Sequence, residues 1–367
     1  TFGMEGMFRQ LGIYAVTGQL FEPQDAGQLA YYREDTKGQI LEEGITEAGA
    51  MSSWIAAATA YSNHNRQMIP FFAYYSMFGH QRIGDFVWAA ADMRARGFLM
   101  GGTAGRTTLN GEGLQHEDGH SLLIASTVPN CRAYDPTFGY EMAVIIQAGL
   151  QEMVAEQQDL HYYITMMNEN YQHPPMPEGC EDGIRRGMYL FSEGQKTDKK
   201  TKGKRAQLLG SGTILREVIA AAELLRDDWK IESDIWSCPS FNELRRDGLD
   251  CERWNRLHPD EDPVVPYVTK CLDKRDGPAI CATDYMKAYG DQIRPFVPMP
   301  FHVLGTDGFG RSDTREKLRD FFEVDCRWIV LTTLNAFVEM GELDAKELKK
   351  AIKQYEIDPD KPNPLYV

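Results

Sequence analysis

The chain has 367 residues, of which 43% are hydrophobic, 11% aromatic and 25% charged. This composition is typical of a globular protein, and the length exceeds the size at which one hydrophobic core stops growing, so two domains are expected. A net charge of −15 disfavours nucleic acid and anionic membranes as partners, and the longest apolar stretch, residues 68–79, is shorter than the ~20 residues needed to span a bilayer.

The cysteines and the first ten residues bear on the cellular compartment. The seven cysteines form no CxxC pair and are odd in number, which is typical of free thiols in a reducing compartment. Residues 1–10 include Glu5 and Arg9 and lack the apolar region of a signal peptide. We therefore expect a cytoplasmic protein. The chain begins with Thr1 and not with Met, as a fragment would.

Four apolar segments in the first half of the chain predict β-strands, with Gly-bounded helical patterns among them. The segments are residues 68–76, 97–102, 129–134 and 160–167. Asp135 followed by Pro136 predicts a helix N-cap, and helical spacing continues over residues 140–153. Strands that alternate with helices predict a mainly parallel sheet flanked by helices.

A change of composition then predicts a linker over residues 176–205. It follows a proline cluster and contains a run of lysines that we interpret as a solvated loop. The α/β pattern returns after it, with strands over residues 206–209 and 231–237 and helices over residues 214–226 and 342–355. The sequence therefore predicts one α/β domain over residues 1–175 and a second over residues 206–367.

The most conspicuous motif is HExxH at residues 116–120, the pattern of a zinc hydrolase. Zinc binding by this motif requires a continuous helix, but Gly111, Gly113 and Gly119 interrupt the segment, so we reject this interpretation. Glycine-rich segments that follow a strand often line sites at the carboxyl ends of parallel strands. His116 is thus either an acid, base or hydrogen-bond donor of such a site, or an ordinary loop histidine.

Glu47 and an aromatic cluster are further candidates. Glu47 precedes a segment rich in small residues, which predicts a buried helix. Its carboxyl group either complements the helix dipole at the surface or is desolvated and suited to proton transfer. The aromatic side chains of Tyr75 and Phe78 belong either to the core or to a platform on which a ring stacks.

Six segments together resemble the homodimeric bacterial type of pyruvate dehydrogenase, the thiamine-dependent decarboxylating component of the pyruvate dehydrogenase complex. The likeness runs over the whole chain and is most specific in residues 101–121. It implies two transketolase-like domains, the first of which binds the aminopyrimidine of thiamine diphosphate. The six segments are residues 1–10, 44–47, 74–79, 101–121, 168–171 and 305–313.

The resemblance also implies roles for single residues. Glu47 matches the glutamate that hydrogen-bonds a pyrimidine ring nitrogen of the cofactor, and it counts as both catalytic and cofactor-binding. Tyr75 and Phe78 match aromatic residues around that ring. His116 matches a catalytic histidine that hydrogen-bonds groups derived from the substrate. The implied reaction is oxidative decarboxylation of pyruvate with reductive acetylation of the lipoyl group of dihydrolipoyl acetyltransferase.

The chain departs from the family in one respect. The family holds Mg²⁺ and the diphosphate with a Gly-Asp-Gly and Asn motif, which is absent here, so we expect no metal ligand in this chain. The chain resembles the C-terminal part of the family, without the N-terminal half and the first strand of the pyrimidine domain. We expect it to act with that half and with a second subunit of a homodimer. The alternatives are a non-catalytic dimerisation or interaction fragment, another 2-oxo acid dehydrogenase, or a transketolase.

Overall fold

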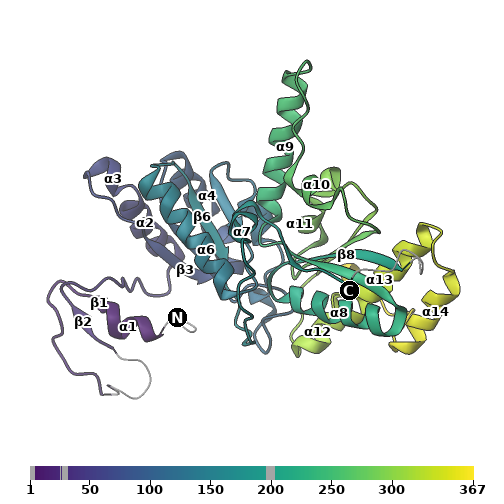
Figure 1. Cartoon of the computed structure of the whole chain (residues 1–367). Coiled ribbons are helices and arrows are strands. Elements are labelled where there is room, and N and C mark those ends of the chain that lie inside the picture. The colour runs from purple at the N-terminus through teal and green to yellow at the C-terminus, as the bar shows by residue number, and fades with distance from the viewer. Residues whose placement is uncertain (1–4, 25, 27–31, 196–202) are drawn as a thin grey trace.

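In a computed structural model, which describes residues 5–24, 26, 32–195 and 203–367, two large sheets and their helices form most of the molecule (Figure 1). The first sheet has four strands in the order β3-β4-β6-β5, and each strand runs parallel to its neighbours. Its strands are β3 (Phe71–Tyr75), β4 (Phe98–Gly102), β5 (Cys131–Tyr134) and β6 (His161–Thr165). The elements around it are α2 (Glu47–Ala58), α3 (Ala60–Asn63), α4 (Ser76–Asp92), η1 (Leu114–His116), α5 (Ser121–Ala125), α6 (Gly139–Leu150) and the π-helical turn η2 (Gln151–Ala155).

Strand β4 shows why this sheet is covered on both faces. Leu99 belongs to the same buried cluster as Trp54 of α2 and Ile83 of α4, whereas Phe98 packs with Ile145 of α6 on the other face. Successive side chains of a strand point to opposite faces, so a run of apolar residues needs apolar partners on both sides. The continuous apolar sequence of β4 therefore reflects a central strand between two layers of helices.

The second sheet has five strands in the order β11-β10-β8-β9-β7, and only β7 is antiparallel to its neighbour among the described strands. Its strands are β7 (Tyr189–Ser192), β8 (Lys204–Gly210), β9 (Ile231–Ser237), β10 (Ala279–Ala282) and β11 (Phe301–Leu304). The elements of this half are α7 (Glu181–Arg186), η3 (Gly212–Ile214), α8 (Leu215–Trp229), α9 (Phe241–Leu257), α10 (Tyr267–Leu272), α11 (Lys287–Asp291), η4 (Arg294–Phe296), α12 (Arg315–Phe321), α13 (Cys326–Glu339), α14 (Ala345–Gln354) and η5 (Pro364–Tyr366).

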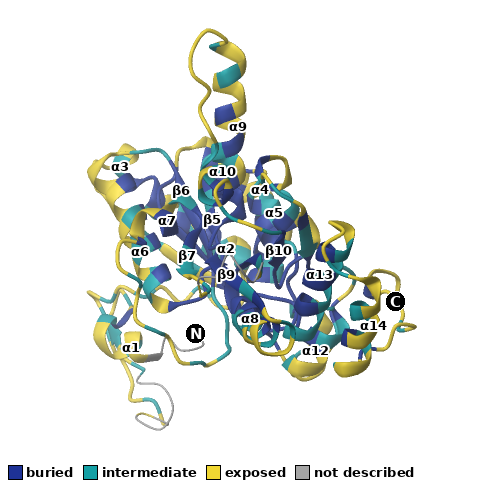
Figure 2. Cartoon of the chain, turned by 45° about the vertical axis from the view of Figure 1, so that its right-hand side comes forward, coloured by how far each residue is buried: buried dark blue, intermediate teal, exposed yellow. Residues whose placement is uncertain are grey.

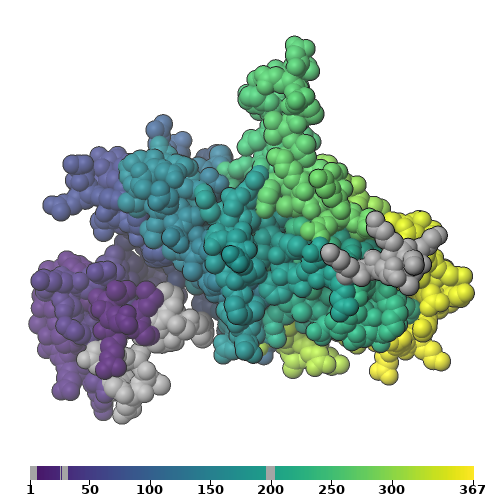
Figure 3. Space-filling view, viewed as in Figure 1, coloured from purple at the N-terminus to yellow at the C-terminus, as the bar shows by residue number. Residues whose placement is uncertain are grey.

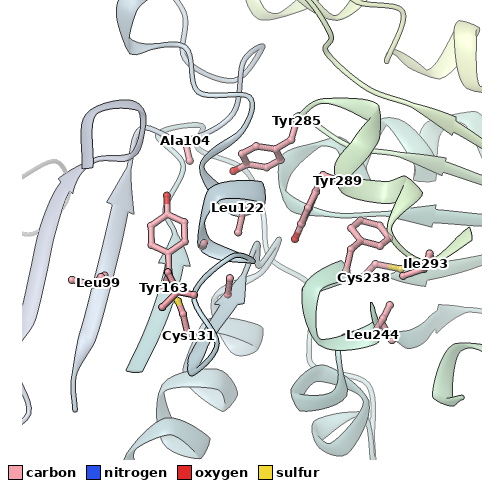
Figure 4. Packing of buried hydrophobic residues seen from close by; sticks show 14 of the residues in the cluster. Leu99, Ala104, Leu122, Cys131, Tyr163, Cys238, Leu244, Tyr285, Tyr289 and Ile293 are labelled. Atoms are coloured by element: carbon pink, nitrogen blue, oxygen red, sulfur yellow. The ribbon is translucent and has the colours of Figure 1, made fainter. Parts of the chain in front are cut away.

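Buried residues follow the two sheets and the inner faces of the helices, and the outer faces of α12 and α14 are exposed (Figure 2). One apolar cluster continues from the first sheet to the second. In Figure 4, Tyr163 lies on one side of this cluster and Tyr285 and Tyr289 on the other, with Leu122 between them. The two halves are therefore joined by a shared core.

Two parts extend from this body. The elements α1 (Glu5–Leu11), β1 (Ile13–Tyr14) and β2 (Glu34–Asp35) lie to one side of it in Figures 1 and 3. Helix α9 begins against β5 and projects outward with its C-terminal half (Figures 1 and 3). No helix among the described residues is both long and apolar enough to cross a membrane.

The fold class predicted from the sequence, α/β with mainly parallel sheets flanked by helices, is confirmed. The N-cap prediction for Asp135 is wrong, because α6 begins only at Gly139 and its N-cap residue is Phe138. The predicted linker contains α7 and β7, since buried Ile184 and Tyr189 draw this segment onto the body. Residues 196–202 of its basic run lie outside the described residues. The exact domain boundaries remain predictions.

Candidate active site

Tyr75, Phe78 and His116 lie together at the carboxyl edge of the four-stranded sheet. Tyr75 is the last residue of β3, and Phe78 follows in the first turn of α4. The centroid of the His116 ring is 4.9 Å from that of Tyr75 and 5.0 Å from that of Phe78. Three of the four site residues that we singled out in the sequence therefore meet in one place. We call these three side chains the aromatic wall.

The connection after β4 brings His116 to this place. It has little regular structure: η1 ends at His116, Glu117 is extended, and His120 is the N-cap residue of α5. The two histidines of the HExxH motif consequently stand on different elements. A zinc hydrolase needs both on one face of one helix. The expectation that this motif is not on a continuous helix is thus confirmed.

Glu47 is connected to the aromatic wall through Arg82. Glu47 is the first residue of α2, after the N-cap residue Thr46, and its Oε1 atom lies 2.8 Å from Nη1 of Arg82. The guanidinium carbon of Arg82 stands 4.2 Å from the centroid of the Phe78 ring. Phe78 and Arg82 are four residues apart on α4, so they share one face of the helix. The sequence analysis missed Arg82, although this spacing could have indicated it.

Helix α2 is less buried than we expected. Met51, Trp54 and Ala58 face the core, but Ala48, Ser52 and Ala56 are exposed. The indole N–H of Trp54 donates to the carbonyl oxygens of Pro70 and Phe98, at 3.2 and 3.1 Å, and so fixes the helix against β3 and β4.

Glu47 is consequently accessible in this chain. The side chain of Glu47 is 22% exposed and that of Arg82 is 54% exposed, so the prediction of a buried helix is wrong for the outer face of α2. The small residues pack on one side of α2 only, because no described segment covers the other side.

The four side chains offer a limited set of chemical functions. The aromatic wall can bind a flat ring, a carboxyl group can exchange a hydrogen bond or proton with a ring nitrogen, and an imidazole can donate to or accept from an oxygen. Among the described residues, no group of three or more His, Cys, Asp or Glu side chains could hold a metal ion. The site is therefore suited to the ring part of a ligand.

The segment that carries His116 is also tied to the second sheet. Asp284, which follows β10, accepts hydrogen bonds from the backbone N–H groups of Thr107 and Thr108, at 2.8 and 3.1 Å, and from both of their hydroxyl groups. Burial raises the pKa of Asp284 above its usual range, and these hydrogen bonds oppose that rise. The connection after β4 is thus fixed from the carboxyl edge of the five-stranded sheet.

Asp135 makes a second polar contact between the two sheets. Its carboxyl group accepts hydrogen bonds from Thr165 at 2.6 Å, Ser211 at 2.7 Å and Tyr285 at 3.2 Å. Burial raises the pKa of Asp135 to about 7, although these three hydroxyl groups counteract the effect. These partners, which lie far away in the sequence, explain why Asp135 does not cap a helix.

The sequence matches two domain families. Residues 1–174 match the family described as the pyruvate dehydrogenase E1 component middle domain, and residues 187–325 match the transketolase-like C-terminal domain. The chain is 65% identical, over 366 residues, to the pyruvate dehydrogenase E1 component of Pseudomonas aeruginosa. The match covers 100% of this chain and 41% of that relative.

Solved structures agree with this fold. The transketolase from Leishmania mexicana gives a TM-score of 0.62 at 15% identity, over 92% of this chain and 44% of that chain. A chain described as "Split gene transketolase, inactive beta4 tetramer" gives 0.55 at 13% identity, over 92% of this chain and 96% of that chain. Such low identities show similarity of fold alone.

The fold and the two matched domains define a transketolase-like protein. Within this class, the chain belongs to the family of the pyruvate dehydrogenase E1 component and contains its middle and C-terminal domains. It spans about 41% of the length of the Pseudomonas aeruginosa relative.

Proposed function

We propose that this chain supplies the pyrimidine-binding side of the active site of a pyruvate dehydrogenase. The observation that carries the proposal is the meeting of Tyr75, Phe78 and His116 at one sheet edge, with Glu47 linked to them through Arg82. The high identity to the Pseudomonas aeruginosa relative supports the same assignment. A free interaction module would not need two aromatic rings and an imidazole in one place with a carboxyl group linked to them through Arg82.

The proposed ligand of this site is thiamine diphosphate. When bound, this cofactor supplies an electron sink that lets a 2-oxo acid lose carbon dioxide. Tyr75 and Phe78 would hold the flat aminopyrimidine ring and exclude water from one of its sides. Glu47 would share a proton with a ring nitrogen, and α2 would orient its carboxyl group. His116 would hydrogen-bond an oxygen of the substrate, which in general contributes roughly 10² to 10⁴ in rate.

The described residues offer no evident ligands for the diphosphate group of this cofactor or for its Mg²⁺ ion. They contain no candidate cluster for a metal ion. We therefore propose that the ligands of Mg²⁺ and of the diphosphate belong to the N-terminal half of the complete enzyme, and that a second subunit completes the site. In this proposal the chain alone is inactive, as the similar split-gene transketolase chain is described to be.

The proposed overall reaction is the oxidative decarboxylation of pyruvate with reductive acetylation of a lipoyl group. The lipoyl group would belong to dihydrolipoyl acetyltransferase, and the reaction would take place in the bacterial cytoplasm. A 2-oxo acid substrate is favoured over the sugar substrates of a transketolase, because the chain is 65% identical to a pyruvate dehydrogenase component and only 15% identical to the Leishmania transketolase.

The experiment uses a chimera that joins this chain to the part of the Pseudomonas aeruginosa relative that precedes the matched region. Reduction of ferricyanide is measured with thiamine diphosphate and Mg²⁺. We expect reduction by the chimera with pyruvate, none with a ketose phosphate, and none by this chain alone. A folded, assembled chimera that does not turn over pyruvate would refute the proposal, and faster turnover of the ketose phosphate would favour a transketolase.

A further inference from the structure

Glu117, the residue directly after His116, makes a contact that the function described so far does not use. Its side chain points into the protein, and the residue is only 1% exposed. Its Oε2 atom accepts a hydrogen bond from the backbone N–H of Arg311 at 2.7 Å. Arg311 lies in residues 305–314, which connect β11 to α12 in the C-terminal domain. We call residues 305–314 the β11–α12 loop.

The β11–α12 loop fits closely around this carboxyl group. A Cβ atom added at Gly310 would lie 2.8 Å from both Cβ and Oε2 of Glu117, a distance that real Cβ atoms essentially never show. Arg106 contacts the same loop at a second place, because its Nη1 atom donates to the carbonyl oxygens of Thr306 at 2.5 Å and Gly308 at 2.6 Å. The segment that carries His116 therefore holds this loop at two points.

The charge of Glu117 is poorly satisfied. Its Oε1 atom is buried and has no hydrogen-bond partner in the described structure. Burial raises the pKa of Glu117 to about 7, and the Arg311 N–H and the Arg106 guanidinium act in the opposite direction. A buried carboxyl group costs free energy when one of its oxygens has no hydrogen-bond partner, so a contribution to stability does not explain the presence of Glu117 here. Residues that conflict with local rules in this way concentrate at functional sites.

We propose that Glu117 is a positioning residue that acts through His116. Its hydrogen bond to Arg311 ties the end of η1 to the β11–α12 loop, so the C-terminal domain determines where the His116 ring stands against Tyr75 and Phe78. The inference rests on the proposed function for the role of His116. It gives the C-terminal domain a part in the active site, although none of the four site residues lies in it.

The first test is independent of catalysis. Hydrogen–deuterium exchange is measured by mass spectrometry over residues 112–120 in this chain. Glu117→Ala removes the hydrogen bond and Gly310→Ala separates its partners, so both should raise exchange in this segment about tenfold or more. Glu117→Gln keeps an acceptor oxygen, and Ser312→Ala changes an exposed side chain of the same loop, so both should exchange like the parent. Unchanged exchange in Glu117→Ala would show that the hydrogen bond between Glu117 and Arg311 does not hold η1 to the β11–α12 loop, and would overturn the proposal.

The second test asks whether the hydrogen bond between Glu117 and Arg311 affects catalysis through His116. In the active chimera, Glu117→Ala should lower kcat about ten- to hundredfold, because a misplaced catalytic group loses its alignment. Glu117→Gln should restore most of the activity. In a His116→Ala background, Glu117→Ala should lower kcat further by less than about threefold, since coupled residues are not additive. An equal loss in both backgrounds would overturn the proposal.

The two tests separate this inference from the proposed function. A parent chimera without pyruvate turnover refutes the proposed function, and the role of Glu117 through His116 falls with it. The exchange measurement would still show whether Glu117 ties its segment to the C-terminal domain.

Discussion

Replacement of Asp135 by asparagine isolates the electrostatic cost of one buried carboxyl group between the two sheets. Asp135 is fully buried and accepts from three hydroxyl groups. An asparagine of the same shape keeps the acceptor for Thr165 and Tyr285. Its amide can donate to Ser211, whose hydroxyl can then turn to Thr283 at 3.2 Å. The variant should therefore fold with the parent contacts.

The sign and size of the effect follow from the pKa of Asp135, which burial raises from 3.8 to about 7. The folded state holds the proton more tightly than the unfolded state does. The contribution of this group to stability is therefore fully present below about pH 4 and is lost as the pH rises through about 7. Between pH 5 and pH 8 the parent should lose roughly 3 kcal/mol from this group, as an upper bound.

Urea unfolding of the parent and Asp135→Asn at pH 5 and pH 8 measures this loss. The variant has no proton to lose, so its stability relative to the parent should rise with pH. The raised pKa values of Glu117 and Glu141 affect both proteins alike and cancel in the difference, whereas Asp284, whose charge interacts with that of Asp135, cancels only in part. A difference that is the same at both pH values would refute the reasoning, because it would show that Asp135 is ionised or protonated throughout.

Three further predictions concern single side chains. Phe78→Ala should raise the Kd of the chimera for thiamine diphosphate about tenfold in a calorimetric titration, because one ring of the aromatic wall is lost, and an unchanged Kd would contradict the assignment. Trp54→Phe should lower the free energy of unfolding in urea by about 1 to 2 kcal/mol, since the donor to two carbonyl oxygens is removed. Gly277 has φ +85° and no room for a Cβ atom beside the Arg205 carbonyl, whereas Gly341 has φ +72° and open space around it. Gly277→Ala should thus lower the thermal midpoint far more than Gly341→Ala, whose cost is only about 1 to 2 kcal/mol, and equal shifts would contradict the geometry.

Local sequence patterns identified all four strands of the first sheet and two strands of the second, but only a minority of the helices. Strands β3, β4, β5 and β6 each lie within a predicted apolar segment, and α8 begins one residue after its predicted start. Such patterns depend on contacts within each segment or on burial of whole faces. Asp135 shows the limit of this reasoning, because its partners Thr165, Ser211 and Tyr285 come from three other segments. Tertiary hydrogen bonds there override a local capping signal.

In the candidate site, too, some residues could be predicted from the sequence and others depend on tertiary contacts. The resemblance singled out Glu47, Tyr75, Phe78 and His116, whose roles remain predictions. Arg82 escaped notice because an arginine on a helix is usually solvated. A role for Glu117 was set aside when the zinc-hydrolase interpretation of its motif was rejected. Only its contacts with Gly310 and Arg311 of the C-terminal domain show that it has a specific partner. No pattern within residues 101–121 contains that information.

The most direct measurement of the central claim is the exchange of the thiazolium C2 proton of bound thiamine diphosphate for deuterium in the chimera and in its Glu47→Ala variant. If Glu47 activates the cofactor from the start of α2, the variant should still bind thiamine diphosphate but exchange this proton at least about a hundredfold more slowly than the parent. Equal exchange rates at full cofactor occupancy would contradict the account.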